Sequence, residues 1–241
     1  MTKPLQVLVM AGGLGTRLLP LSASVPKPMI EIGGKSVLEL LLRRLHANGL
    51  SSVCIAVNHL QAPIREFIRN GLCLDLTVEF LEEGKPLGTC GAISLVLDRM
   101  AEDFILINGD IVTDLDLSEL MTLHRASGAV CTVAVTPRTT TLEYGVIELG
   151  DSGEVQRVVE KPTLTHLTMM GVYCFRRSTL HRFVPPGEHL DTPTLVSALL
   201  QEGLKVGTFV TNARWIDIGR PDQVVRAADL FPELLTQPSG P

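Results

Sequence analysis

The sequence predicts an α/β fold whose mixed, mainly parallel sheet is flanked by helices, and two patterns carry this prediction. Over the first 110 residues, continuous apolar runs alternate with amphipathic helical segments. Strands buried on both faces of a parallel sheet read as such runs, and a helix connects each strand to the next. Over residues 129–175, four strand-like runs follow one another with short links, which favours antiparallel pairing.

The first half of the chain supplies the parallel strands. We expect them at LQVLVM (5–10), VCIAV (53–57), LTVEFL (76–81) and FILI (104–107). Ser36 and Glu39 match a capping box that opens the first helix. Pro63 begins a short second helix, and a third helix is expected from about Cys90 to Met100.

The second half contributes the antiparallel part of the sheet. Strands are expected at 129–135, 144–149, 154–160, 171–175 and 206–210, and helices near 118–127, 193–202 and 221–230. No repeat, low-complexity linker or shift in composition marks a boundary. We therefore expect a single domain over residues 1–230, followed by a C-terminal tail over 231–241.

Composition excludes several classes of function. The chain has 241 residues, a formal net charge of −5 and only 4% aromatic residues. Because it has neither a basic block nor stacking aromatics, we expect no nucleic-acid partner and no membrane partner. Five cysteines without metal-binding spacing, no signal region and no long apolar run predict a cytoplasmic protein with reduced thiols.

The stretch AGGLGTRLLPLSASVPKPM (11–29) places three glycines directly after the first strand. A glycine turn at the carboxyl end of a strand lies where open α/β sheets bind ligands, and bare backbone N–H groups approach phosphate oxygens closely. Arg17 and Lys27 then supply positive charge for a polyphosphate. An ordinary turn with two solvated cations is the alternative, and the combination of turn and cations favours a nucleotide site.

Two better-known phosphate-binding motifs do not fit this region. The dinucleotide fingerprint GxGxxG needs a third glycine where the chain has Leu18, which weakens an oxidoreductase interpretation. A P-loop ending in GKS (34–36) needs its first glycine where the chain has Met29. IGGKS (32–36) is therefore predicted to be a tight turn into a capped helix.

The glycine-rich stretch resembles the signature of the sugar-1-phosphate nucleotidyltransferases, GGxGTRLxP followed by PKPM. The resemblance continues in the family's order with PLGTCGA (86–92), NGD (108–110), YGV (144–146), EKP (160–162), GVY (171–173) and WIDIG (215–219). Together these motifs cover nearly the whole chain. The resemblance is strongest to the short mannose-1-phosphate and heptose-1-phosphate guanylyltransferases, and it implies a Rossmann-like fold and a metal-dependent transfer.

The reaction that the resemblance implies joins a nucleoside triphosphate and a sugar-1-phosphate. An oxygen of the sugar phosphate attacks the α-phosphorus, pyrophosphate leaves, and a nucleoside-diphosphate sugar forms. Asp110 and Asp217 occupy the family's metal positions and would hold Mg²⁺, which takes few protein oxygens and keeps phosphate or water ligands. A turn-forming Asp110 and a helix-capping or salt-bridged Asp217 are the structural alternatives.

The family's motifs also assign the remaining site residues. Arg17 is expected to stabilise the transferring phosphate and Lys27 to bind the triphosphate. Further nucleotide contacts are expected at Ala11, Gly12, Gly13, Gly15, Thr16, Gly88 and Thr89. Contacts to the sugar phosphate are expected at Gly145, Glu160, Lys161 and Met170. A solvated ion pair that closes a strand is the alternative for the two charged residues of that set.

The nucleotide base can be predicted from Glu83. Uridylyl- and thymidylyltransferases of the family carry a glutamine five residues before the loop glycine, and here that position before Gly88 is Glu83. An ionised carboxylate only accepts hydrogen bonds, and guanine offers two adjacent donors, N1–H and N2–H₂. GTP is therefore the expected nucleotide. Glu82 is the alternative acceptor, and a surface position of Glu83 is the structural alternative.

The acceptor sugar stays open. Mannose-1-phosphate relatives often carry a polar residue before the GVY strand, where this chain has Met169 and Met170, and thioethers bind a hydroxyl poorly. A polar contact from Thr168, a heptose phosphate and a cyclitol phosphate are the alternatives for this position.

Other functions and the oligomeric state are also left open. Uridylyl, thymidylyl or cytidylyl transfer is one alternative, and a non-catalytic sugar-nucleotide sensor on the same fold is another. A sensor would be expected to lack Arg17, Lys27 or an aspartate, and all are present. Apolar strands in the second half could support a homodimer.

Overall fold

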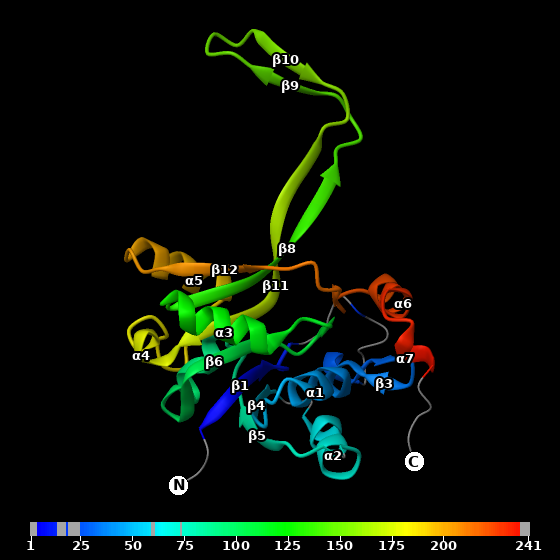
Figure 1. Cartoon of the computed structure of the whole chain (residues 1–241), viewed down its shortest axis with the longest axis vertical. Coiled ribbons are helices and arrows are strands. Elements are labelled where there is room, and N and C mark those ends of the chain that lie inside the picture. Colours follow the sequence, from blue (N-terminus) through cyan, green and yellow to red (C-terminus); the bar gives the residue numbers. More distant parts are fainter. Residues whose placement is uncertain (1–3, 14–17, 19–24, 59–60, 73, 237–241) are drawn as a thin grey trace.

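The computed structural model of the chain describes residues 4–13, 18, 25–58, 61–72 and 74–236 (Figure 1). Within these residues a seven-stranded sheet runs in the order β12-β8-β11-β6-β1-β4-β5. Its strands are β1 (Leu5–Met10), β4 (Ser52–Val57), β5 (Thr77–Glu82), β6 (Met100–Asn108), β8 (Cys131–Thr141), β11 (Thr163–Arg176) and β12 (Val206–Val210). Four neighbouring pairs are parallel, namely β1 with β4, β1 with β6, β4 with β5, and β8 with β12. The strand β11 is antiparallel to both of its neighbours, β6 and β8. The predicted mixed, mainly parallel sheet is confirmed.

Helices cover both faces of this sheet (Figure 1). On one face pack α1 (Val37–Ala47), α2 (Ala62–Asn70) and α3 (Leu117–Ser127). On the other face pack the 3₁₀ helices η3 (Gly91–Leu95) and η4 (Leu97–Arg99), with α4 (Arg177–Leu180) and α5 (Thr192–Gln201). In β1, Val7 and Val9 enter the first core cluster and Leu8 the second, and none of the three has exposed surface. Burial on both faces explains why this strand reads as a continuous apolar run.

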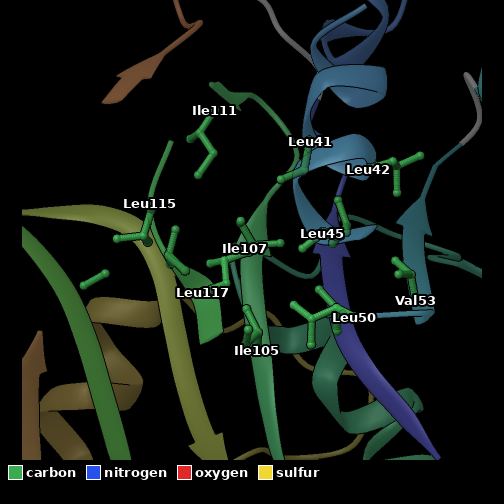
Figure 2. Close-up of a cluster of buried hydrophobic side chains, with 14 of the residues drawn as sticks. Leu41, Leu42, Leu45, Leu50, Val53, Ile105, Ile107, Ile111, Leu115 and Leu117 are labelled. Carbon is green, nitrogen blue, oxygen red and sulfur yellow. The ribbon is translucent and has the colours of Figure 1, made fainter. Parts of the chain in front are cut away.

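The cluster between α1 and the sheet is built from branched aliphatic side chains (Figure 2). Leu41 and Leu45 of α1 share it with Ile105 and Ile107 of β6, and each of the four is at most 3% exposed. Truncating one such leucine to alanine costs about 2–5 kcal/mol, because a cavity remains. This packing holds the end of β6, and with it the residues that follow the strand.

The start of α1 follows its sequence signals. Ser36 caps the helix, and its Oγ accepts a hydrogen bond from Glu39 N at 3.1 Å. Just before it, β2 (Glu31–Ile32) and β3 (Lys35–Ser36) form a two-residue hairpin. Its turn residues Gly33 and Gly34 have φ of 60° and 78°, which glycine adopts at no steric cost. The predicted tight turn into a capped helix is confirmed.

A smaller layer closes the end of the fold beside the sheet. It comprises η2 (Lys27–Met29), β7 (Ile111–Thr113), β13 (Trp215–Asp217), α6 (Pro221–Leu230) and α7 (Glu233–Thr236). Its core includes Phe231, which was expected in the tail and is 3% exposed. Packed structure therefore continues past residue 230, and the division into a domain and a tail stays a prediction.

Two segments differ from the sequence-based expectation. The helix expected from Cys90 to Met100 is wrong, because η3 and η4 are short 3₁₀ helices and β6 already begins at Met100. In addition, β8 and β11 extend beyond the sheet as a two-stranded ladder from Val135–Met169 to Thr141–Thr163. Beyond this ladder, β9 (Val146–Leu149) and β10 (Val155–Val159) form a separate two-stranded sheet.

We call residues 136–169 the arm. It projects away from the sheet and the helices in Figure 1. None of its residues is buried, and none belongs to the three core clusters. The strands expected at 144–149 and 154–160 thus exist, but they form the tip of the arm and not a part of the main sheet. Among the helices of the described residues, none is both long and apolar enough to span a bilayer.

Candidate active site

The candidate site lies at the carboxyl ends of the parallel strands, where β1 and β6 end side by side. Gly109 N donates a hydrogen bond to Met10 O at 2.9 Å. A Cβ on Gly109 would lie only 2.9 Å from the same oxygen, so this close approach requires glycine. Gly12 and Gly13, which follow β1, therefore lie next to Asp110, which follows β6.

A cavity of about 420 Å³ opens at this edge of the sheet. Segments that lie far apart in the sequence form its wall, which consists of Met10, Gly12, Gly13, Lys27, Glu83, Pro86, Leu87, Gly88, Thr89, Asn108, Asp110, His189 and Gly219. Seven of these residues were predicted from the sequence, and they include the residues expected at the triphosphate, the base and the metal. Their chemical roles stay predictions.

Pairing between β7 and β13 brings Asp217 to Asp110. β7 begins directly after Asp110, and Asp217 of β13 pairs with Ile111. Ile218 N donates a hydrogen bond to Asp110 O at 2.8 Å. The Lys27 side chain enters from η2, forms an ion pair with Asp110 Oδ2 and lies 3.5 Å from Asp217 Oδ1. Two carboxylates therefore share one ammonium.

This charge cluster fits a divalent cation. Asp110 Oδ1 is buried and has no hydrogen-bond partner among the described residues. Burial raises the pKa of Asp110, against the opposing effect of the Lys27 ammonium, and the nearby Asp217 carboxylate raises it further. An unpaired buried carboxylate oxygen is costly. Because Mg²⁺ binds through one or two carboxylates and fills its remaining positions with phosphate and water, Asp110 and Asp217 suit it.

Glu83 forms another part of the cavity wall. Its Oε2 accepts a hydrogen bond from Leu87 N at 3.1 Å, while Oε1 is buried without a partner among the described residues. A Cβ on Gly12 would lie 2.9 Å from Oε1, so the glycine turn leaves room for this carboxylate. Burial raises the pKa of Glu83, and the Leu87 hydrogen bond opposes that effect. Neighbouring Glu82 instead pairs with Arg65 at 2.7 Å and does not line the cavity.

The loop after Glu83 is held by the segment that precedes α5. Gly88 has φ of 78°, and a Cβ there would lie 2.6 Å from Leu190 O. Thr89 N and Oγ1 donate hydrogen bonds to Asp191 Oδ1 at 2.9 and 3.1 Å. Leu190 N in turn donates to Leu87 O at 2.9 Å. These contacts fix the loop as a rigid wall of the cavity.

Some of the described residues that were predicted to contact the nucleotide or the sugar do not line this cavity. Gly15, Thr16 and Arg17 are outside the described residues. Ala11 is 4% exposed and donates its N–H to Ala56 O at 2.9 Å, so it supports the turn from behind. Met170 has no exposed surface and belongs to the core cluster. The Met170 side chain is therefore packed in the core and does not line this cavity, and its contact with the sugar stays a prediction.

The other residues expected at the sugar phosphate lie on the arm. A Cβ on Gly145 would lie 3.0 Å from Glu160 Oε2, so these two residues are neighbours. Lys161 follows with φ of 45°, a left-handed conformation that is uncommon outside glycine. All three lie where the tip of the arm joins its ladder, and none of them lines the cavity that holds Asp110.

A second cavity, of about 830 Å³, lies between the base of the arm and α6. We call it the groove. Asp217 and Trp215 contribute to its wall from β13, and Arg226 contributes from α6. Thr168, the alternative polar contact to the sugar, also lines the groove, whereas Met169 does not. Asp217 thus connects the groove with the charge cluster of the first cavity.

Sequence reasoning missed several residues of the first cavity. Asn108 lies in the NGD motif and Gly219 ends the WIDIG motif, but neither residue was assigned a role from the sequence. His189 carried no signal, because neither its spacing nor its neighbours form a motif. Its position depends on the contact between its segment and the loop at Gly88, which only the folded chain reveals.

Comparison with known proteins identifies the family of this chain. The model of the nucleotidyl transferase family matches residues 6–233. The chain belongs to this family. A mannose-1-phosphate guanylyltransferase of Mycobacterium tuberculosis is 31% identical over 99% of this chain and 68% of its own length. A UTP–glucose-1-phosphate uridylyltransferase of Synechocystis sp. is 29% identical over 90% of this chain and 61% of its own length.

Solved structures show the same fold for this nucleotidyl transferase. HddC from Yersinia pseudotuberculosis is 28% identical, covers 94% of this chain and 99% of its own, and has a TM-score of 0.73. A further crystal structure of HddC, complexed with GMP-PN, has a TM-score of 0.70. The predicted family, Rossmann-like fold and enzyme class are confirmed. This nucleotidyl transferase spans 61–68% of the length of the curated relatives it matches, and its cytoplasmic location stays a prediction.

Proposed function

We propose that this chain transfers GMP from GTP to a sugar-1-phosphate, which yields a GDP-sugar and pyrophosphate. The observation that carries the choice of nucleotide is Glu83 Oε1, a buried carboxylate oxygen without a partner among the described residues that lies beside Gly12 in the site cavity. Oε1 can accept from one of the adjacent N1–H and N2–H₂ donors of guanine, and Oε2, which already accepts from Leu87 N, has a second lone pair for the other donor. The guanylyltransferase relatives and the HddC complex with GMP-PN support the same choice.

The triphosphate would lie between the glycine turn and the charge cluster. Gly12 and Gly13 present backbone without side chains there, and Lys27 supplies an ammonium at the cavity wall. An oxygen of the sugar phosphate would attack the α-phosphorus as the bond to the β-phosphate oxygen breaks, and pyrophosphate would leave with that electron pair. Arg17, which follows the same turn in sequence, is assigned to the charge on the transferring phosphate.

Asp110 and Asp217 would hold the metal, for which we propose Mg²⁺. When bound, the ion would neutralise negative charge on the phosphates of both substrates. The carboxylates themselves set its position, because the β7–β13 pairing fixes their separation. Lys27, which pairs with both carboxylates in this structure, keeps them from repelling each other when no cation is bound. The protein thus supplies positioning and charge, and no covalent nucleophile is needed.

Pyrophosphate release tests the proposal directly. Purified protein is mixed with Mg²⁺, each of ATP, CTP, GTP, UTP and dTTP, and each of a panel of mannose, glucose and heptose 1-phosphates. We expect release with GTP that depends on one sugar phosphate and is abolished in Asp110→Asn. The matched control Asp98→Asn removes a carboxylate that is 89% exposed and outside the site, and it should leave the rate unchanged. Preference for UTP or dTTP would contradict the role of Glu83.

A further inference from the structure

Asn108 places an unpaired side-chain amide in the wall of the site cavity. It is the last residue of β6 and is half-buried, and within the described part of the chain its amide group forms no hydrogen bond. Buried polar groups in folded proteins nearly always have a hydrogen-bond partner, and the few polar groups that line a cavity orient its ligand. An amide that faces the cavity without a partner is therefore a candidate contact to a substrate.

The backbone around Asn108 is held by strands on both sides, which fixes the position of the amide. On one side Asn108 pairs with Met10 of β1, and on the other side the antiparallel pairing of β6 with β11 begins at Ile107 and Val172. Gly171, directly before that pair, has φ of 76°, and a Cβ there would lie 2.7 Å from Asn108 Nδ2. Glycine at position 171 therefore leaves the space that the amide occupies.

The other polar side chains of the cavity have partners or assigned roles. Under the proposed function, the carboxylates and the ammonium of the wall serve the base, the phosphates and the metal. Thr89 Oγ1 already donates a hydrogen bond to Asp191. This leaves the amide of Asn108 and the imidazole of His189, which lies against the loop at Gly88. The substrate groups that still lack a partner are the hydroxyls of the two sugar rings.

The order of the strands indicates which sugar ring lies beside Asn108. Along the edge of the sheet the strands follow one another as β5, β4, β1, β6 and β11. The base is assigned to Glu83, which follows β5, and the phosphates to the glycine turn after β1 and to Asp110 after β6. The amide of Asn108 lies beside Gly171 of β11, on the far side of β6 from β1. Because the ribose of a nucleotide lies between its base and its phosphates, the ring beyond the phosphates is that of the acceptor.

We propose that Asn108 hydrogen-bonds the C2 hydroxyl of the acceptor sugar and thereby selects the acceptor. An amide both donates and accepts, which suits a hydroxyl. Asn108 stands two residues before Asp110, so it reaches the hydroxyl nearest to the phosphate that the metal would hold. It also supplies a polar contact that the thioethers of Met169 and Met170 cannot make. This inference rests on the proposed use of a sugar phosphate, but not on the choice of guanine.

Discrimination between acceptors with and without the C2 hydroxyl tests this role. Pyrophosphate release is measured with mannose 1-phosphate, with glucose 1-phosphate, which is its C2 epimer, and with 2-deoxyglucose 1-phosphate. For the parent protein, kcat/KM with one epimer should exceed that with the deoxy analogue by about 10-fold, as expected for two hydrogen bonds between uncharged groups. In Asn108→Ala this preference should fall to about twofold or less. The same preference in both proteins, or none in the parent, would overturn the proposal.

Two further variants and a second nucleotide serve as controls. Asn108→Leu keeps the approximate volume of the side chain without its hydrogen bonds, so it should lose the preference as Asn108→Ala does. Thr168→Val removes the alternative polar contact, which lines the groove, and it should retain the full preference. The ratio of kcat/KM for GTP to that for 2′-deoxy-GTP should be the same in the parent and in Asn108→Ala. Loss of the acceptor preference only in Thr168→Val, or a change only in the nucleotide ratio, would overturn the proposal.

A binding measurement separates this inference from a failure of the proposed function. If UTP or dTTP replaces GTP as the donor, the guanine assignment fails, and the same acceptor ratios measured with that nucleotide still test Asn108. If no pair of substrates releases pyrophosphate, calorimetry measures the binding of the three sugar phosphates without nucleotide. The parent should then bind one epimer about 10-fold more tightly than the deoxy analogue, and Asn108→Ala should not. Equal affinities in the parent, or no binding, would overturn the proposal.

Discussion

Glu83 is the single residue on which the choice of base depends. Glu83→Gln replaces one carboxylate oxygen, an acceptor, by an amide NH₂ group, a donor. The variant should therefore lose one of the proposed hydrogen bonds to the guanine base. A hydrogen bond to a charged group contributes about 1.5–3 kcal/mol, so kcat/KM for GTP should fall about 10- to 100-fold. Activity with UTP should rise relative to GTP. Glu82→Gln, on the exposed neighbour that pairs with Arg65, should change neither value.

The pH dependence of GTP use follows from the same carboxyl. Burial raises the pKa of Glu83, so the group takes up a proton at a higher pH than an ordinary glutamate does. The protonated form loses an acceptor, and kcat/KM for GTP should therefore fall as the pH is lowered through that raised pKa. In Glu83→Gln this part of the pH profile should be absent. A profile that is identical in both proteins would show that Glu83 does not meet the base in its ionised form.

A substitution at Gly88 tests whether the loop in the same cavity wall requires glycine at this position. Gly88→Ala places a Cβ 2.6 Å from Leu190 O on a backbone with φ of 78°. Strain of this kind costs about 1–3 kcal/mol, which denaturant unfolding would detect. Because Gly88 lines the cavity, KM for GTP should rise as well. The control Gly84→Ala meets no atom within 4 Å and should leave both quantities unchanged; equal stability of the two variants would contradict the strain.

At the scale of elements, the sequence predicts those helix starts and strands that depend on residues close together in the chain. The capping box at Ser36 and Glu39 marked the start of α1, and the apolar runs marked β1, β4, β5 and β6, because burial on both faces leaves a clear pattern. The sequence also predicts a helix from about Cys90 to Met100, and this prediction is wrong. There the contacts of the loop with Leu190 and Asp191 decide the backbone, and these are distant in sequence.

The arm shows a second case in which the sequence pattern predicts the elements but not their tertiary contacts. The strands over 144–149 and 154–160 have ordinary alternating patterns, and such patterns do not say which sheet a strand joins. Two motifs predict Asp110 and Asp217 as site residues, and the pairing of β7 with β13 brings the two side chains together, while their role at a metal stays a prediction. His189 was missed because only tertiary contacts bring it to the cavity.

The packing of α3 on the sheet gives an element-scale prediction for stability. His124 of α3 has no exposed surface, and its Nδ1 lies 2.8 Å from Thr132 Oγ1. Burial lowers the pKa of His124, against the opposing effect of Asp103. A histidine in the unfolded chain has a pKa of about 6.5. Just below this pH, His124 is therefore protonated in the unfolded chain and still neutral in the folded chain.

Acidification should therefore lower the free energy of unfolding. The contribution of His124 to the free energy of unfolding is present above about pH 6.5 and is lost as the pH falls through that value. Denaturant unfolding between pH 7 and pH 5 should show a smaller decrease in His124→Gln than in the parent protein. His46→Gln, on the exposed side of α1, serves as the matched control and should keep the parent's slope. A parent-like slope in His124→Gln would contradict the assignment.

At the scale of the whole molecule, we propose that the arm binds one substrate and that the body, which is the rest of the described chain, binds the other. Of the described residues assigned to the nucleotide, all but Ala11 line a cavity of the body, whereas Gly145, Glu160 and Lys161, assigned to the sugar phosphate, lie on a segment that shares no residue with the core clusters. Val146 and Val159 are paired at the base of the tip. Residues 147–158 can therefore be replaced by Asn-Gly, which forms the two-residue turn that such a pair accepts.

This shortened chain should separate nucleotide binding from transfer. Because no core contact is removed, it should fold, and calorimetry should find GTP affinity within about threefold of the parent value, since a change well below 1.4 kcal/mol is expected. Pyrophosphate release with the sugar phosphate should nevertheless be lost, because Glu160 and Lys161 directly follow the tip and the strand pairing that holds their backbone is shortened. Loss of GTP binding together with transfer would show that the arm supports the nucleotide cavity as well. Retained transfer would show that the tip has no part in either site.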